Sequence, residues 1–427
     1  MKRTGHLRSA AVFAAVCGFA VGQSAGSERP LREATAQRRL AASDAAFLHG
    51  AVQLTRRADF LRAGEAYFSP DQRWIIFQAT PVPPEGEEPT PHYEMYAAPL
   101  LWDGEPGAAD ARVAGLGEIV QLSKPGSANT CGWFHPTEPG RVLFGSTVEP
   151  PVRDEKAGFQ RDGGNYSWPF PAETEMVTGV IPQAAGSEGE LAGPITEPLF
   201  RRDGYDAEGT WSPGGRWVLY THVDPETDDP DIWLYDTADG SQHEIVAEPG
   251  YDGGPFFAPD FDDDAGGRII YRSDRRQDKH LQVYIAEVAI EGGTPRLARE
   301  HAITSDGHVN WAPYLHPSGE YLAYTTSREG HFNYELFGIS AKPGLKPDER
   351  GYIRLTDAPG FDGLGVFSPD GRWLMWTAQR GGPEEGDDRP SSQLWIARFD
   401  AEAFESALRR ADRDALLRET APAGEPN

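Results

Sequence analysis

A proline-centred turn between an aromatic strand and an apolar strand recurs six times along the chain, and this repeat limits the possible folds more than any other feature. Its clearest copy is FSPDGRWLMW, from Phe367 to Trp376. The anchor prolines of the six copies are Pro70, Pro136, Pro213, Pro259, Pro317 and Pro369. The shortest separation, from Pro213 to Pro259, is close to the ~40–50 residues of a four-stranded propeller blade.

The residues of each copy predict an antiparallel hairpin. Proline presets φ at the first corner, Asp tolerates the second, and Gly takes the left-handed position that closes the turn. A third strand follows, as in DIWLYD and QLWIARF, and a fourth precedes the next copy, as in VQLS and HEIV. The sequence therefore predicts an all-β chain folded as a six-bladed β-propeller, with short N- and C-terminal helices.

The sixth copy lacks a fourth strand of its own. After Phe399 the chain continues as DAEAFESALRRADRDALLR, which has the pattern of an amphipathic helix. The segment AVQLT, Ala51 to Thr55, lies ahead of the first copy and belongs to no other blade. We therefore expect residues 51–55 to form the outer strand of the sixth blade, which would close the ring and remove its open edge.

The organisation expected from the sequence has four parts. Residues 1–26 have the basic start, apolar stretch and small-residue exit of a signal peptide, so we expect a periplasmic or secreted protein. A helical segment is expected over 27–50, the propeller over 51–399, and a helix with a tail over 400–427. The repeats are expected near 63–98, 129–181, 206–236, 252–289, 310–340 and 362–399.

The two cysteines and the net charge bound the chemistry and the partners. Val16, rather than a small residue, precedes Cys17, so lipidation there is not expected. Cleavage of the signal would leave Cys131 alone, as a small buried side chain, so no intrachain disulfide is expected. The formal charge of −26 repels nucleic acid, and the apolar stretch of the signal is too short to span a membrane.

The basic cluster RSDRR, Arg272 to Arg276, is expected to pair with local carboxylates.

The quoted segments resemble a known repeat family. GYDAEGTWSPGGRWVLYT, RIIYRSDRR, VNWAPYLHPSGEYLAYTTS and GFDGLGVFSPDGRWLMWTAQR are similar to the PD40, or WD40-like, repeats of TolB-type six-bladed propellers. The resemblance covers about residues 51–399, and it implies a propeller that binds proteins. It does not extend to TolB itself, since TolB carries an α/β domain before its propeller and this sequence has no room for one.

A ring of Asp and Asn residues is the main candidate site. Five of the six residues that stand seven before an anchor proline are Asn129, Asp206, Asp252, Asn310 and Asp362; the sixth is Ala63. In a structural interpretation, these side chains accept hydrogen bonds from their own turn or from the adjacent blade. In a functional one, they join Glu65 and Glu208 in a polar rim at the channel mouth that binds a cationic segment or Ca²⁺. The two interpretations can coexist. Asp206, Asp252 and Asp362 are the metal candidates, a structural Ca²⁺ is possible, and no organic cofactor is expected.

Two functions from different classes remain open at this stage. The first is a non-catalytic scaffold of the periplasm or cell envelope that binds a protein or peptide through the channel mouth and the long loop 149–171. The alternative is a metal-dependent propeller enzyme, a lyase or hydrolase, that acts on a glycan or a sugar acid. Clustering of His308, His316 and His331 would favour the enzyme, and dispersal would argue against it. A purely structural role in the envelope is a third possibility.

Overall fold

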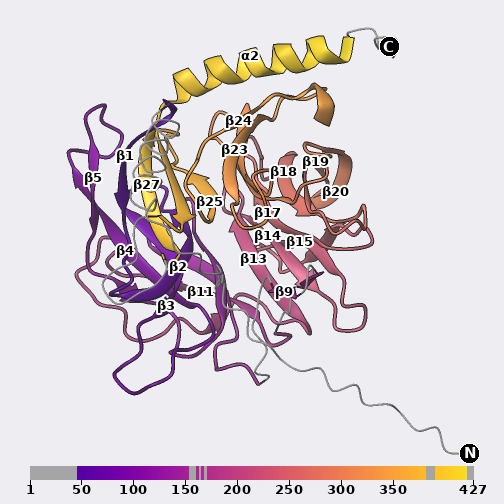
Figure 1. Cartoon of the computed structure of the whole chain (residues 1–427). Helices are drawn as coiled ribbons and strands as arrows, with labels where there is room; N and C mark the ends of the chain where they lie inside the picture. The colour runs from indigo at the N-terminus through magenta and orange to yellow at the C-terminus, as the bar shows by residue number, and fades with distance from the viewer. Residues whose placement is uncertain (1–45, 153–159, 163–164, 168–170, 381–389, 421–427) are drawn as a thin grey trace, which may run out of the picture.

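The computed structural model describes residues 46–152, 160–162, 165–167, 171–380 and 390–420, and its six main sheets form the blades of a propeller (Figure 1). The innermost strand of each blade packs against strands of the blade before it, and the innermost strand of the last blade meets that of the first. The all-β, six-bladed prediction is therefore confirmed. The expected signal peptide, most of the expected N-terminal helical segment and part of the loop 149–171 lie outside the described residues.

Blades 1 to 3 follow one another along the chain, each built from the axis outward. Blade 1 contains β2 (Phe60–Phe68), β3 (Trp74–Pro81) and β4 (Glu94–Asp103), with both β5 (Arg112–Leu116) and β6 (Val120–Gln121) paired to β4. Blade 2 contains β7 (Asn129–Phe134), β8 (Arg141–Ser146), β11 (Glu175–Val180) and β12 (Glu197–Pro198). Its loop carries a small hairpin of β9 (Gln160–Asp162) and β10 (Asn165–Ser167). Blade 3 contains β13 (Tyr205–Trp211), β14 (Trp217–Val223), β15 (Pro230–Asp236) and β16 (Gln242–Val246).

Blades 4 to 6 repeat the same order, and the last one takes its outer strand from the start of the chain. Blade 4 contains β17 (Asp252–Phe257), β18 (Gly266–Ser273), β19 (Gln282–Glu291) and β20 (Thr294–Ala302). Blade 5 contains β21 (Asn310–Leu315), β22 (Tyr321–Thr326), β23 (Glu335–Ser340) and β24 (Tyr352–Arg354). Blade 6 contains β25 (Asp362–Phe367), β26 (Trp373–Ala378), β27 (Gln393–Phe399) and β1 (Leu48–Gln53).

Strand β1 closes the ring by pairing antiparallel with β27, with Leu48 opposite Phe399. The ladder continues past β1, since the N–H of Leu394 donates to the Thr55 hydroxyl at 2.9 Å. The closure prediction is confirmed. The strand begins at Leu48 rather than at Ala51, so residues 48–50, expected at the end of a helical segment, are extended instead. The reason is that the Leu48 side chain is buried in the core of blade 6 beside Phe399.

A hairpin from blade 1 makes a second connection across the same seam. The loop between β4 and β5 reaches blade 6, where the guanidinium of Arg372 donates to the carbonyl of Gly107. Arg398 donates to the carbonyl of Ala109 in the same loop. Beside it the ring of Trp102 meets that of Trp373 edge to face, with centroids 5.2 Å apart. The first and last blades are therefore connected both by strand β1 and by this hairpin.

The recurrent proline turns serve the architecture. In blade 6 the Ser368 hydroxyl donates to Asp370 Oδ1 at 2.6 Å and accepts from the Trp373 N–H at 3.0 Å, while Gly371 has φ of 71°. Blade 5 has His316 in place of the serine, and its Nε2 lies 3.2 Å from the carbonyl oxygen of Gly371 in the next blade. Burial lowers the pKa of His316 to about 4. This histidine is therefore a neutral link between two turns.

Backbone hydrogen bonds link successive blades at one repeated position. The residue seven before the anchor proline donates its N–H to the carbonyl that precedes the third strand of the blade before it. The pairs are Ala63 to Ser392 (2.9 Å), Asn129 to Tyr93 (2.9 Å), Asp206 to Thr174 (2.9 Å), Asn310 to Leu281 (2.8 Å) and Asp362 to Tyr334 (2.9 Å). These bonds join the blades at five of the six junctions, close to the axis.

The C-terminal helix α2 (Ala401–Thr420) lies beside the outer strand of blade 5, along one edge of the propeller (Figure 1). The short 3-10 helix η2 (Pro347–Glu349) precedes that strand. The Phe404 ring is fully buried 4.9 Å from that of Tyr321, which anchors the first turns of α2. The expected C-terminal helix is therefore confirmed. In the part of the chain that the structure describes, no helix is both long and apolar enough to cross a membrane.

Candidate binding site at the propeller axis

One residue in each innermost strand adopts a left-handed backbone conformation. It stands five before the anchor proline, and strand register shifts by one residue around it in every blade. The six residues are Glu65 (φ 47°), Cys131 (49°), Glu208 (57°), Gly254 (58°), Ala312 (46°) and Leu364 (55°). Side chains of a regular strand point to the two faces of its sheet, here toward the neighbouring blades. A bulge re-aims its side chain, and all six residues border one cavity at the axis.

Aromatic rings cross the axis on one side of this cavity. They belong to residues three before the anchor proline in four of the blades, namely Tyr67, Trp133, Phe256 and Tyr314. The centroid distances are 4.9 Å from Tyr67 to Trp133, 5.7 Å from Trp133 to Phe256 and 5.4 Å from Phe256 to Tyr314. The volume open to the centre of a water molecule is about 20 Å³, enough for one or two waters. The cavity therefore suits a very small group.

A buried ion pair occupies part of the cavity wall. Glu208 Oε1 accepts from Arg272 Nη2 at 2.5 Å, and Glu208 Oε2 accepts from the Thr221 hydroxyl and the Gly254 N–H, both at 2.7 Å. A Cβ on Gly254 would lie 1.9 Å from Arg272 Nη1. Blade 4 therefore has no side chain at its left-handed position because Arg272, from its second strand, fills that place. The expected pairing of the RSDRR cluster with carboxylates is confirmed here, and again where Arg275 pairs with Asp252 at 3.0 Å.

Among the residues that the structure describes, the donors to the Glu65 carboxyl are neutral. Its carboxyl accepts from Gln78 Nε2 at 2.9 Å, from Cys131 Sγ at 3.0 Å and from the Tyr67 hydroxyl at 3.2 Å. Burial raises the pKa of the Glu65 carboxyl, and the hydrogen bond from Cys131 offsets part of this effect. Burial also raises the pKa of the Cys131 thiol, and the nearby charge of Glu65 raises it further. Cys131 is a buried free thiol, as expected, and it lines the cavity as well.

The three aspartates of the expected ring lie between the blades and not in the cavity wall. Asp206 Oδ1 is 2.8 Å from His222 Nδ1, Asp252 Oδ1 accepts from Arg275 Nη2 at 3.0 Å, and Asp362 Oδ1 accepts from Arg380 Nε at 2.7 Å. All three side chains are fully buried. They occupy regular strand positions, which direct them into the sheet faces. These three residues therefore do not line the axial cavity, and hydrogen bonds within the fold account for their side chains, as in the structural interpretation. Their role in binding stays a prediction.

The two asparagines of the ring have the same structural surroundings. Asn129 Nδ2 donates to the carbonyl of Tyr93 in blade 1 at 3.0 Å, and Asn310 Oδ1 accepts from the Thr326 hydroxyl at 2.7 Å. Both are buried and neither lines the axial cavity. Of the residues named from the sequence as rim members, the cavity brings together Glu65 and Glu208 alone. The sequence marked Arg272 as a partner of some carboxylate but not of Glu208, and it did not mark Tyr67 or Tyr314, because the six left-handed positions share a backbone shape and no side-chain chemistry.

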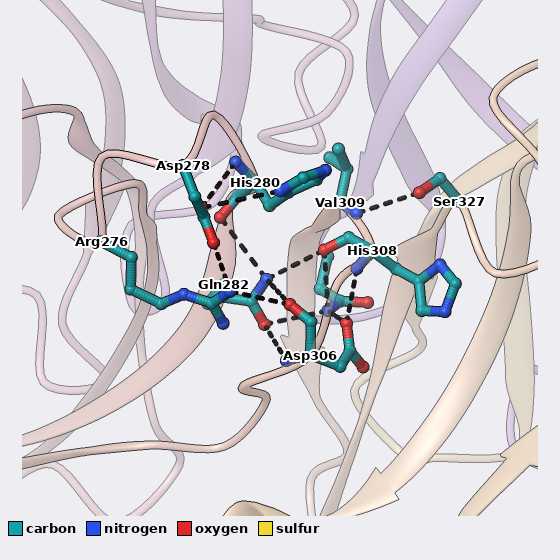
Figure 2. Close-up of polar contacts among 9 residues, drawn as sticks. Arg276, Asp278, His280, Gln282, Asp306, His308, Val309 and Ser327 are labelled. Carbon is teal, nitrogen blue, oxygen red and sulfur yellow. Dashed lines mark hydrogen bonds and ion pairs between the residues drawn. The ribbon is translucent and has the colours of Figure 1, made fainter.

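The polar contacts between blades 4 and 5 involve one of the three histidines considered for a metal site (Figure 2). Gln282 Nε2 donates to the carbonyl of His308 at 2.9 Å, and Asp306 Oδ1 accepts from the His308 N–H at 2.9 Å. His308 thus contributes its backbone to the inter-blade network. His316 lies at the opposite end of β21, in the turn, and His331 Nδ1 lies 3.4 Å from the Tyr334 hydroxyl.

His316 is therefore separated from His308 and His331, which lie at the other end of blade 5. Over the described ranges, no group of three or more His, Cys, Asp or Glu side chains is arranged to hold a metal ion. The metal candidates Asp206, Asp252 and Asp362 likewise have separate partners, as described above. A structural Ca²⁺ stays a prediction.

The two ends of the propeller differ in their connections. At the end where the innermost strands begin, which we name the loop face, loops join the second strand of each blade to the third. The opposite end, the turn face, carries the proline turns. Three loop-face connections, from blades 1, 2 and 5, each expose a large apolar side chain: Val82 (42% exposed), Val152 (93%) and Phe332 (59%). The Pro/Glu-rich connection 81–92 of blade 1 is exposed over most of its length.

A scan against models of protein families finds no match, and a search of curated proteins finds none. Among solved structures, the chain is similar to a putative TolB from Agrobacterium tumefaciens, with 14% identity, a TM-score of 0.44, and coverage of 79% of this chain and 91% of that one. It is similar to TolB from Acinetobacter baumannii, with 14% identity, a TM-score of 0.43, and coverage of 80% and 64%. A third match is Kuenenia stuttgartiensis hydrazine synthase, with 10% identity, a TM-score of 0.42, and coverage of 73% and 44%.

Proposed function

We propose that the protein is a non-catalytic scaffold that binds a protein or peptide on its loop face. The observation that carries this proposal is the set of exposed apolar side chains there, Val82, Val152 and Phe332, each on a loop of a different blade. Loops held on a rigid scaffold commonly carry the residues that bind a partner. A partner that spans several blades could cover all three at once.

The frame beneath these loops favours recognition over chemistry. Backbone bonds join the blades near the axis, and strand β1 closes the ring. The loops can therefore differ in sequence while the scaffold stays packed. The axial cavity, at about 20 Å³, is far below the ~300–1,000 Å³ of pockets that bury organic ligands. The alternative of a metal-dependent enzyme acting on a glycan or sugar acid has no observation of its own in its favour.

We further propose that the protein works in the periplasm or cell envelope, or is secreted. This rests on the signal-peptide pattern of residues 1–26, where Lys2, Arg3 and Arg8 precede an apolar stretch. The partner is then an envelope protein or peptide. A nucleic acid is disfavoured because the formal charge of the chain is −26.

Site-specific photo-cross-linking tests the proposal. One variant carries a photoreactive amino acid at Glu87, in the exposed blade 1 connection, and another at Phe332. A matched control carries it at Asp239, an exposed residue in the connection between β15 and β16 on the turn face. We expect cells that express these variants to yield the same cross-linked protein from Glu87 and Phe332 and none from Asp239, as identified by mass spectrometry.

Equal cross-linking from both faces, or no cross-linked protein from the loop face, would overturn the proposal. Changing the ring aspartates is a poorer test, because Asp252 and Asp362 are fully buried in ion pairs with Arg275 and Arg380. Removing one partner of a buried pair typically costs about 3–5 kcal/mol, so lost binding would not be distinguishable from lost folding.

A further inference from the structure

The charges around the axial cavity are unevenly paired. Two carboxyl groups, Glu65 and Glu208, and one guanidinium, Arg272, border it. Arg272 lies against Glu208, with Nη2 at 2.5 Å from Oε1. The side chains that donate to the Glu65 carboxyl are Gln78, Cys131 and Tyr67, all of them neutral. A carboxylate in such surroundings is stabilised by a cation that enters the cavity.

The floor of the cavity adds a second attraction for a cation. The rings of Tyr67, Trp133, Phe256 and Tyr314 pack against one another across the axis and line the cavity together with Glu65. The face of an aromatic ring attracts a cation within about 6 Å of its centroid, more strongly where water is excluded. A carboxyl group and an aromatic layer thus border the same small space from different strands.

The size of the cavity selects the kind of cation. About 20 Å³ is open to the centre of a water-sized sphere. A primary ammonium head is compact and has three rotatable donors, whereas a guanidinium is a wider planar fork. We infer that the axial cavity binds one primary ammonium group, with Glu65 as its counter-ion and the four aromatic rings as its floor.

The proton balance of binding follows from the state of Glu65. Burial raises the pKa of this carboxyl, so in the empty cavity Glu65 keeps its proton to a higher pH than an ordinary glutamate does. When an ammonium group enters with its three protons and its positive charge, Glu65 loses its proton to the solvent and becomes the carboxylate. Binding therefore releases up to one proton and leaves the net charge of the cavity unchanged.

The ammonium group can come from two sources. One is the free ammonium ion, and the other is the end of a lysine side chain or an N-terminus of a partner held on the loop face. Binding of an ammonium group from a partner rests on the proposed function, whereas binding of the free ammonium ion does not. Ammonium ion and n-butylammonium, which resembles the end of a lysine side chain, separate the two: the compound that binds more tightly indicates the source.

Calorimetric titration of the full folded protein tests the inference. Ammonium chloride, n-butylammonium chloride and tetramethylammonium chloride are titrated at constant ionic strength and mildly acidic pH, in two buffers that differ in ionisation enthalpy. We expect saturable binding of at least one of the first two compounds, with proton release that disappears as the pH rises through the pKa of Glu65. Tetramethylammonium, which has the same charge but is too large, should not bind.

Two variants make the test specific. Glu65→Gln keeps the shape of the side chain and removes its charge, and it should weaken binding by about tenfold or more and abolish the proton release. Glu105→Gln, at an exposed carboxyl that pairs with Arg73, is the matched control and should leave both unchanged. Circular dichroism and melting curves establish that each variant is folded.

Three results would overturn the inference: binding of tetramethylammonium equal to that of the smaller amines, amine binding that Glu65→Gln retains in full, or no saturable binding of either small amine. None of these results bears on the cross-linking experiment. A cross-linked partner on the loop face without amine binding would support the proposed function and overturn the ammonium site. Amine binding without a cross-linked partner would support the ammonium site and overturn the proposed function.

Discussion

Replacing Gly254 by alanine tests whether Arg272 takes the place of a sixth side chain directed to the axis. A Cβ at Gly254 would lie 1.9 Å from Nη1 and 2.5 Å from Cζ of Arg272, and the backbone there has φ of 58°. The methyl group and the guanidinium cannot both stay. Arg272 would have to leave its position against Glu208, and that carboxylate would remain partly buried without its cation.

The expected cost has two parts. Alanine in a left-handed conformation costs about 1–2 kcal/mol. Breaking a buried ion pair costs about 3–5 kcal/mol. Gly254→Ala should therefore lower the free energy of unfolding by about 4–7 kcal/mol, a large part of the ~5–15 kcal/mol that stabilises a typical protein. Urea unfolding at neutral pH, followed by tryptophan fluorescence, measures this change.

A double-mutant cycle isolates the contribution of Arg272. In an Arg272→Ala background the clash is absent, so Gly254→Ala should cost only the backbone part, about 1–2 kcal/mol. Ala312→Gly is the matched control, because Ala312 already holds an alanine at the equivalent left-handed position, with φ of 46°. The reasoning is refuted if Gly254→Ala costs the same in both backgrounds.

Three further predictions concern the turns and the closure of the ring. Deleting residues 48–53 removes the outer strand of blade 6 and should lower the melting temperature sharply in calorimetry; an unchanged melt would contradict the closure. Gly371→Val should cost about 2–5 kcal/mol in chemical unfolding, because φ is 71° and the new Cβ would lie 2.3 Å from His316 Nε2; a neutral result would show that the turn relaxes. The pKa of His316 is about 4 in the fold against an ordinary 6.5, so the unfolded chain alone binds this proton as the pH falls from 6.5 to 4. The free energy of unfolding should then decrease by about 3 kcal/mol over that range, and His316→Gln should remove this part of the pH dependence.

The arrangement of the blades could be predicted from the sequence because it depends on residues with special backbone preferences. Proline and glycine fix φ, and the Ser-x-Asp hydrogen bonds of the turn recur as Ser69 with Asp71 and as Ser368 with Asp370. The six proline turns together set the number of blades. The unmatched segment 51–55 and the missing outer strand after Phe399 then predicted the closure.

The site at the axis was harder to predict from the sequence, for a physical reason. A left-handed bulge can be occupied by almost any residue when the surrounding strands hold it, and here the six occupants include Glu208, Cys131 and Leu364. Reading the strands as regular placed the aspartates and asparagines at the channel mouth. The bulge instead turns a different residue toward the axis and leaves Asp206 and its equivalents between the blades. A shared backbone shape with unrelated side chains leaves no pattern in a single sequence.

The pairing of β1 with β27 has a consequence for the order of folding. Leu48 meets Phe399, so the strand that closes the ring is synthesised before blades 1 to 5, and its partner is synthesised after them. Blades 1 to 5 can form while the chain emerges, but blade 6 waits for both ends. Closing so long a loop is slow, and the unpaired edge of β27 is open to other chains in the interval. We therefore expect the pairing of β1 with β27 to be the slow, final step of folding.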